Sequence, residues 1–100
     1  MTKITKATFK SFAKKNKGKL YIKDRYHFDG RTDGTEDGDN TFTEANYSEW
    51  ANNHANKTLG IGGVWLAHGG CDHFSAYKDD KFEGIEVYNA CGCFTLAKRI

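Results

Sequence analysis

The chain has 100 residues, a length typical of a single domain with one modest hydrophobic core. No run approaches the roughly 20 apolar residues that a membrane-spanning helix needs, and residues 1–20 lack an apolar stretch of signal-peptide length. The net charge of +2 combines eight lysines without a carboxylate in residues 1–23, eight carboxylates against two arginines in residues 24–50, and a balanced second half.

The first expected elements are a helix and a strand. Thr5 is a suitable N-cap for a helix over residues 6–16, and Gly18 is a suitable residue to end it. Residues 19–28 alternate apolar and polar side chains, which predicts a strand. That alternation places four apolar or aromatic residues on one face: Leu20, Ile22, Tyr26 and Phe28.

The middle of the chain predicts a loop and a second helix. Residues 29–41 contain glycine, asparagine and acids but no large apolar residue, so a loop is expected. Thr43 is a possible N-cap for a helix through Asn53, with Tyr47, Trp50 and Ala51 facing inward. After Gly62 the chain turns to short apolar or alternating runs that predict four strands: Val64–His68, His73–Lys78, Gly84–Asn89 and Cys93–Lys98.

Together these elements predict a single α+β domain over residues 1–100. Two helices would pack on one face of a roughly five-stranded, mostly antiparallel sheet, in the order α-β-α-β-β-β-β. Exposed strand edges in such a sheet leave self-pairing as an option. The expected core consists of Phe9, Phe12, Leu20, Ile22, Trp50, Val64, Trp65 or Leu66, Ile85, Val87, Phe94 and Leu96.

Histidine and cysteine gather on neighbouring predicted hairpins, and their side chains are the ligands that zinc prefers. The group consists of His68, Cys71, His73, Cys91 and Cys93. One residue separates Cys91 from Cys93, whereas structural zinc sites usually place two to four residues between paired cysteines. Free, reduced cysteines and a turn histidine are therefore favoured, and we expect no metal and no cofactor.

The acidic segment between the first strand and the second expected helix has three interpretations. Asp33, Asp37, Asp39 and Glu44 partly match a calcium-binding loop, but a strand stands where an entering helix is required. A solvated acidic loop is the second, and a surface for the basic groove of a nucleic-acid-binding protein is the third. The candidate contact residues are Asp29, Asp33, Glu36, Asp37, Asp39 and Glu44, with Glu49 beside them.

Lys6, Lys10, Lys14 and Lys17 recur at helical spacing, and we call them the lysine stripe. Solvated lysines on an amphipathic helix are the ordinary interpretation, and contact with phosphates is the functional one. No base-reading motif accompanies them. Serine in a nucleophile elbow and phosphate-cradling glycine loops are both missing, so an enzyme is not expected.

Four segments resemble a known group of proteins: residues 5–12, residues 28–30, residues 58–61 and residues 84–89. They are similar to small uncharacterised proteins carried by bacteriophages, prophages and plasmids, a class that includes anti-CRISPR and other anti-defence inhibitors. The resemblance implies stoichiometric binding to a bacterial defence protein or ribonucleoprotein complex, such as CRISPR–Cas, in the host cytoplasm. The alternative is a small accessory protein that binds nucleic acid directly through the lysine stripe.

Overall fold

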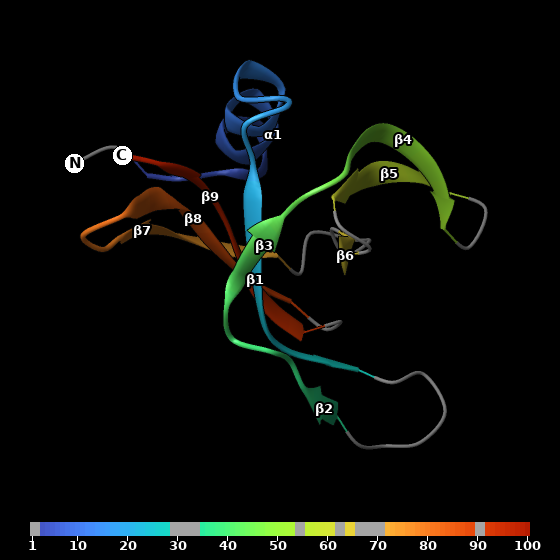
Figure 1. Cartoon of the computed structure of the whole chain (residues 1–100). Coiled ribbons are helices and arrows are strands. Elements are labelled where there is room, and N and C mark those ends of the chain that lie inside the picture. The colour runs from blue at the N-terminus through green and yellow to red at the C-terminus, as the bar shows by residue number, and fades with distance from the viewer. Residues whose placement is uncertain (1–2, 29–34, 54–55, 62–63, 66–71, 90–91) are drawn as a thin grey trace.

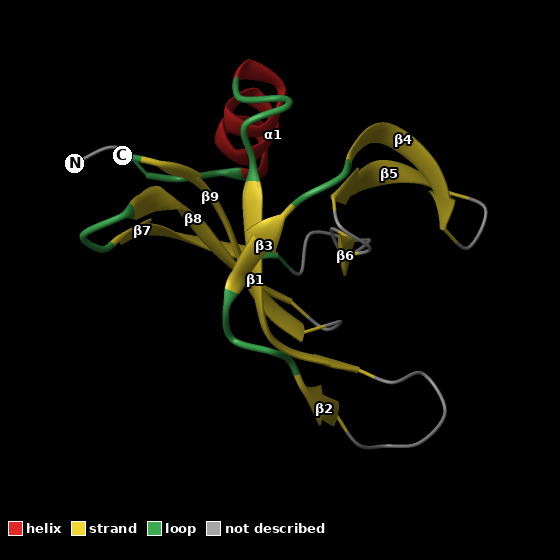
Figure 2. Cartoon of the chain, viewed as in Figure 1, coloured by secondary structure: helices red, strands yellow, loops and turns green. Residues whose placement is uncertain are grey.

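The structure is a computed structural model that describes residues 3–28, 35–53, 56–61, 64–65, 72–89 and 92–100 (Figure 1). Within these residues the chain forms a helix followed by strands, as Figure 2 shows. The elements are α1 (Lys6–Lys15), β1 (Tyr21–Phe28), β2 (Thr35–Asp37), β3 (Phe42–Glu44), β4 (Tyr47–Asn53), β5 (Asn56–Ile61), β6 (Val64–Trp65), β7 (His73–Lys78), β8 (Phe82–Asn89) and β9 (Gly92–Arg99).

Helix α1 begins and ends where its capping residues predict. The side chain of Thr5 accepts a hydrogen bond from the backbone N–H of Thr8, at 3.3 Å, which satisfies a donor in the first turn. Asn16 is the C-cap, and its backbone N–H donates to the carbonyl of Phe12. Gly18 follows with a φ of 87°, a left-handed conformation that suits glycine. The predicted N-cap and helix are confirmed.

The main sheet has the strand order β2-β1-β9-β8-β7, and β3 also pairs with β1. Every pairing in it is antiparallel. Strands β7, β8 and β9 follow one another as hairpins, while β1 comes from the other end of the chain to pair with β9. The α+β class and the antiparallel sheet are therefore confirmed.

The second helix expected over residues 43–53 is wrong, because this segment forms strands β3 and β4. Strand β3 pairs with the first half of β1, with Thr43 opposite Ile22. Strand β4 pairs with β5, which pairs with β6, in a separate three-stranded sheet. A short run with aromatic residues fits either period, and backbone pairing of β3 with β1 and of β4 with β5 favours the extended form. Of the strand predicted at Val64–His68, β6 covers two residues and the rest lies outside the described residues.

The loop expected over residues 29–41 contains a short strand that the sequence did not indicate. Strand β2 pairs with the second half of β1, with Glu36 opposite His27. The chain then continues along the same edge of β1, where the N–H groups of Gly38 and Asn40 donate to the carbonyls of Arg25 and Asp24, both at 2.9 Å. Backbone pairing thus holds a polar segment that has no apolar side chain to bury.

The core lies between α1 and the main sheet. Its buried members are Phe9, Ala13, Leu20, Ile22, Ile85, Val87, Phe94 and Leu96. Seven of these eight residues were expected, Ala13 is the addition, and Phe12 packs against the cluster while partly exposed. Ala45 and Tyr47 also pack on this cluster, so the start of β4 lies on the same side of the sheet as α1. The side chains of Trp50, Val64 and Trp65, and Leu66 as a whole, lie outside the described structure.

A β-bulge in β1 changes which side chains share a face. The register against β9 shifts between Asp24 and Tyr26, so that Tyr26 stands opposite Cys93. Ile22, before the bulge, stands opposite Leu96 and faces α1. An extra residue in a strand moves all later side chains to the other face. The expected common face of Ile22 and Tyr26 is therefore wrong, and Tyr26 lies on the face away from the helix.

Candidate nucleic-acid interface

The outer face of the main sheet, opposite α1, carries a row of rings. Tyr26, Cys93, Tyr88 and His73 stand directly opposite one another on β1, β9, β8 and β7, and we call them the aromatic row. The Tyr88 ring centroid lies 6.4 Å from that of Tyr26 and 6.2 Å from that of His73. Tyr88 is 52% exposed, and His73 is exposed as well. The row therefore presents ring surface on the interior strands β1 and β8 and on the edge strand β7.

Two groups in the aromatic row are held in their neutral forms. Burial and the neighbouring Tyr88 hydroxyl raise the pKa of Tyr26. Burial, and then the negative charge of Glu86, raise the pKa of the Cys93 thiol. Because the thiolate is the nucleophile and the metal ligand, this environment makes Cys93 unreactive. Its small, buried side chain lies between the Tyr26 and Tyr88 positions in the row.

A second group of rings covers the other end of the outer face. It consists of Tyr21, Phe42, Tyr77 and Phe82, and we call it the ring cluster. The Phe42 and Phe82 rings stack with centroids 4.2 Å apart, and Tyr21 meets Phe82 edge-on at 5.3 Å. Beneath this cluster the side chains of Thr95 and Ala97 are buried. The rings thus bury the outer side of β9 where the described residues supply no helix.

Cations accompany the rings on the outer face. The Lys23 ammonium lies 4.4 Å from the Tyr77 ring centroid and 5.0 Å from that of Phe42. Arg99 lies 5.0 Å from the Tyr21 ring centroid, and Arg25 is exposed at the bulge. Cations fixed over aromatic faces need little further ordering to meet an anion.

A hydrogen-bonded chain fixes Lys23 in place. Its ammonium donates to the Tyr77 hydroxyl at 3.0 Å, and that hydroxyl donates to the Asp79 carboxylate at 2.7 Å. The hydrogen bond from Tyr77, followed by those from the N–H groups of Lys81 and Phe82, holds the pKa of Asp79 below its ordinary value of 3.8. The chain ties β1 to the hairpin between β7 and β8.

Acid should remove the contribution of Asp79 to stability. Because its pKa is lower in the folded state, the ionised carboxylate stabilises the fold above about pH 4, and this effect is lost as pH falls through the folded pKa. We expect the difference in unfolding free energy between wild type and Asp79→Asn to be largest near neutral pH and to disappear in acid. Urea unfolding over a series of pH values measures it. A difference that does not change with pH would contradict the assignment.

The lysine stripe does not lie free on the helix. The Lys6 ammonium pairs with the Asp72 carboxylate at 3.1 Å, and Lys17 lies 5.3 Å from the centroid of the Tyr47 ring. Lys10 is half-buried and Lys14 is exposed, and both also have interaction partners. Two of the four side chains therefore hold α1 against other parts of the fold.

The structure places only part of the acidic segment. Asp37, Asp39 and Glu44 are exposed along β2, β3 and the connection between them, and we call these three residues the acidic edge. Glu36 lies in β2, but its side chain is outside the described structure, as are Asp29 and Asp33. The side chain of Glu49, in β4, is likewise not described.

The zinc and calcium interpretations gain no support from the described residues. Among them no three histidine, cysteine or acidic side chains come close enough to hold a metal ion. Cys93 and His73 stand in one cross-strand row, and β8, which carries Tyr88, lies between their strands. His68, Cys71 and Cys91 lie outside the described residues.

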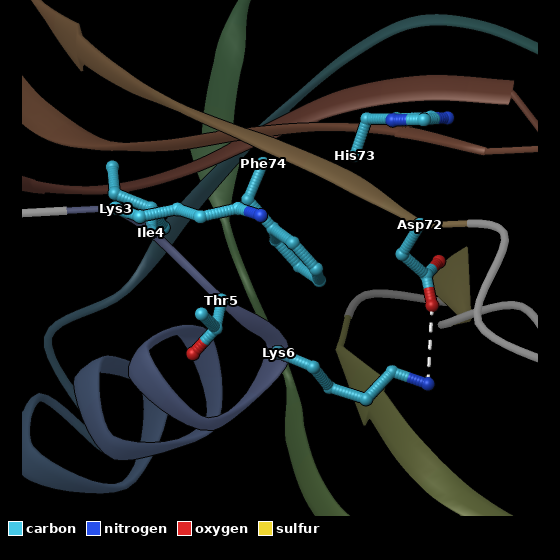
Figure 3. A pocket seen from close by; sticks show the side chains of 7 residues that line it. All are labelled: Lys3, Ile4, Thr5, Lys6, Asp72, His73 and Phe74. Carbon is cyan, nitrogen blue, oxygen red and sulfur yellow. Dashed lines mark ion pairs between the residues drawn. The ribbon is translucent and has the colours of Figure 1, made fainter.

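A cavity of about 420 Å³ opens where α1 begins (Figure 3). It is lined by Lys3, Ile4, Thr5, Lys6, Asp72, His73 and Phe74. The side chain of Asp72 is 1% exposed, and it accepts a hydrogen bond from Asn89 at 2.9 Å besides pairing with Lys6. The buried carboxylate would repel an anion at this helix end, so we interpret the cavity as a joint between α1 and the sheet.

The sequence-based search missed the outer face. Tyr26 lies more than forty positions before His73 and more than sixty before Tyr88, and each of the three alone is an ordinary strand residue. A usable signal existed in β8, where Glu86 and Tyr88 alternate with Ile85 and Val87. That pattern indicates a strand whose second face is not buried by a helix.

Comparisons with known proteins found no match to a protein-family model, to a curated protein or to a solved structure. In the part of the chain that the structure describes, no helix has the length and apolar character needed to cross a membrane. A functional conclusion for this chain therefore depends on the chemistry of its surfaces.

Proposed function

We propose that the protein binds single-stranded nucleic acid on the outer face of its main sheet. The aromatic row carries this proposal, because Tyr88 is 52% exposed on a central strand. An exposed phenol ring supported by rings on both sides, as Tyr88 is by Tyr26 and His73, offers a flat surface for a base.

Cations beside the rings supply the phosphate contacts that such binding needs. Arg25 is exposed on β1 next to Tyr26, at one end of the aromatic row, while the Lys23 ammonium lies over the Tyr77 ring in the ring cluster. Glu86 is half-buried in β8 and disfavours a phosphate over the middle of the sheet. We therefore expect bases over Tyr88 and phosphates along β1.

The geometry favours single strands over duplexes. Stacking on a protein ring requires a base that is not already stacked between its neighbours in a helix. The outer face carries rings in a row across strands, and the sequence contains no motif for a helix that enters a groove.

Replacing Tyr88 by alanine should weaken binding to single-stranded oligonucleotides. Loss of one base–ring stack costs about 1–3 kcal/mol, so the dissociation constant should rise about 5- to 150-fold. Fluorescence anisotropy with labelled single-stranded DNA and RNA at low salt measures it. Tyr88→Phe keeps the ring and should keep the affinity.

The double variant Lys10→Ala/Lys14→Ala tests the alternative location on the lysine stripe. On the proposal it retains most of the affinity, while a larger loss than in Tyr88→Ala would move the interface to α1. Unchanged binding in Tyr88→Ala, or no binding by the wild-type protein, would refute the outer-face interface. Circular dichroism of each variant checks that the fold is intact.

The acidic edge favours a second function, inhibition of a bacterial defence complex. Asp37, Asp39 and Glu44 are exposed along one edge of the sheet, and a row of carboxylates can occupy a basic nucleic-acid groove. On this proposal the protein belongs to the mobile-element inhibitors, acts without catalysis in the host cytoplasm, and binds a complex such as CRISPR–Cas.

Charge reversal separates the second function from the first. A tagged protein should retain a stoichiometric defence complex from nuclease-treated bacterial lysate, and Asp37→Lys/Asp39→Lys/Glu44→Lys should release it. Asp80→Lys is the matched control, since Asp80 is an exposed acid in the turn between β7 and β8. Retention by the triple variant would exclude the acidic edge as the contact.

A further inference from the structure

Strand β7 forms one edge of the main sheet. The hydrogen bonds of the hairpin between β7 and β8 show which backbone N–H and C=O groups of β7 point away from β8. The N–H of Asp79 donates to the carbonyl of Phe82 at 2.9 Å. Since successive residues of a strand direct their N–H and C=O groups to opposite sides, Tyr77, Ser75 and His73 bond to β8 in the same way. The hydrogen bond from Ile100 to the carbonyl of Lys81 agrees with this alternation. The groups of Phe74, Ala76 and Lys78 therefore point outward.

Most of the features that usually prevent edge pairing are missing from β7, and the exception is Lys78 at its end. The register between β7 and β8 runs without a bulge, and the four residues from Phe74 to Tyr77 contain no charge and no proline. No strand among the described residues pairs with its outer side. The opposite edge of the sheet, by contrast, is lined by the acidic edge.

We propose that two copies of the chain pair through β7, antiparallel, about a twofold axis at Ser75. This register makes bonded pairs of Phe74 with Ala76 of the second copy, and it places His73 beside Tyr77 of the second copy. It brings Lys78, at one end of the strand, beside Asp72, at the other end, and keeps the two Lys78 side chains apart. Aromatic pairs across strands, such as His73 with Tyr77, stabilise such contacts.

The pairing has a geometric consequence for the outer face. Directly opposite residues in antiparallel strands share a face, and here only even-numbered residues of β7 offer outward groups. The outer faces of both copies therefore lie on the same side. Figure 3 shows His73 on the side of β7 away from Phe74 and α1. Through His73, each aromatic row would continue into the ring cluster of the second copy, which begins at Tyr77. The pairing itself does not depend on nucleic-acid binding.

Sedimentation equilibrium of the full chain over a wide range of concentrations tests the proposal. We expect a concentration-dependent dimer for wild type and a monomer for Ala76→Pro. Proline lacks the N–H that Ala76 directs outward, and the β7–β8 ladder does not use that N–H. Asp80→Pro is the matched control, because proline suits the first central position of the turn that follows β7, and it should remain dimeric.

A wild-type protein that stays monomeric throughout would overturn the proposal. A dimer that persists in Ala76→Pro would overturn it too, since association would then use another surface. Ala76→Glu provides a second test with the N–H retained, because it places two like charges near the twofold axis, and it should also be monomeric. The circular dichroism spectrum of each variant, compared with that of wild type, shows whether β7 still pairs with β8.

Discussion

Phe9→Ala is expected to remove about 3–5 kcal/mol of the free energy of unfolding. Phe9 is 1% exposed, and its ring centroid lies 5.7 Å from that of Phe74 and 6.2 Å from that of Phe94. It is the largest side chain that α1 buries against the sheet, so its loss leaves a cavity between the two layers. A domain of this size has a total stability of about 5–15 kcal/mol, so the loss is a large fraction of it.

Urea unfolding followed by circular dichroism measures this loss. Phe12→Ala is the matched control, because Phe12 lies one turn away on the same helix but is only partly buried. It should cost about 1–2 kcal/mol. Equal costs for both variants would show that α1 does not pack against the sheet through Phe9.

Gly84→Ala is the second change with a large expected effect, about 3 kcal/mol of destabilisation. A Cβ atom at this position would lie 2.0 Å from the carbonyl oxygen of Leu96 and 2.6 Å from the Cα of Ala97. Both neighbours are backbone atoms of β9, so no side chain can move away and the β8–β9 pairing must distort. This cost outweighs the gain of about 0.4–1 kcal/mol that an alanine brings by restricting the unfolded chain.

Gly18→Ala serves as the control for Gly84. Gly18 has a φ of 87°, and no atom lies within 4 Å of a Cβ built there, so backbone strain is its only cost. That strain is about 1–2 kcal/mol. Thermal and urea unfolding of both variants compare the two costs. A Gly84→Ala protein as stable as wild type would show that β8 and β9 are less closely apposed than the structure has them.

The core was predictable because its signals are local. Phe9 and Phe12 fit a helical period after a capping threonine, and Ile85 and Val87 alternate with polar residues between turns. Such patterns need only a few neighbouring residues to be read. The structure buries Phe9, Ile85 and Val87 as the patterns predict, and Phe12 partly.

The segment over residues 43–53 was not predictable in this way. Thr43 offered a helix cap, and the spacing of Tyr47, Trp50 and Ala51 fitted a helix. The structure instead pairs Thr43 with Ile22, some twenty residues earlier. Pairing of β3 with β1 and of β4 with β5 decides the outcome, and a local pattern carries no information about those partners.

The candidate interface was hidden for a related reason. Simple alternation placed Tyr26 with Ile22 on the core side, but the bulge after Asp24 moved it to the outer face. Only there does Tyr26 meet Tyr88, in a row with His73. The lysine stripe and the acidic segment were visible in the sequence, since charge can be counted without knowing the fold.

The sequence by itself determined α1, the strands β7 to β9, the core between them and the separation of charge, because caps, turns and alternation act over a few neighbouring residues. Only the tertiary structure decided that residues 42–53 are strands and that rings line the outer face. The first outcome depends on the pairing of β3 with β1 and of β4 with β5, and the second on the pairing of β1 with β9 at the other end of the chain. Pairing over such distances follows from which edges remain open after the local elements have formed.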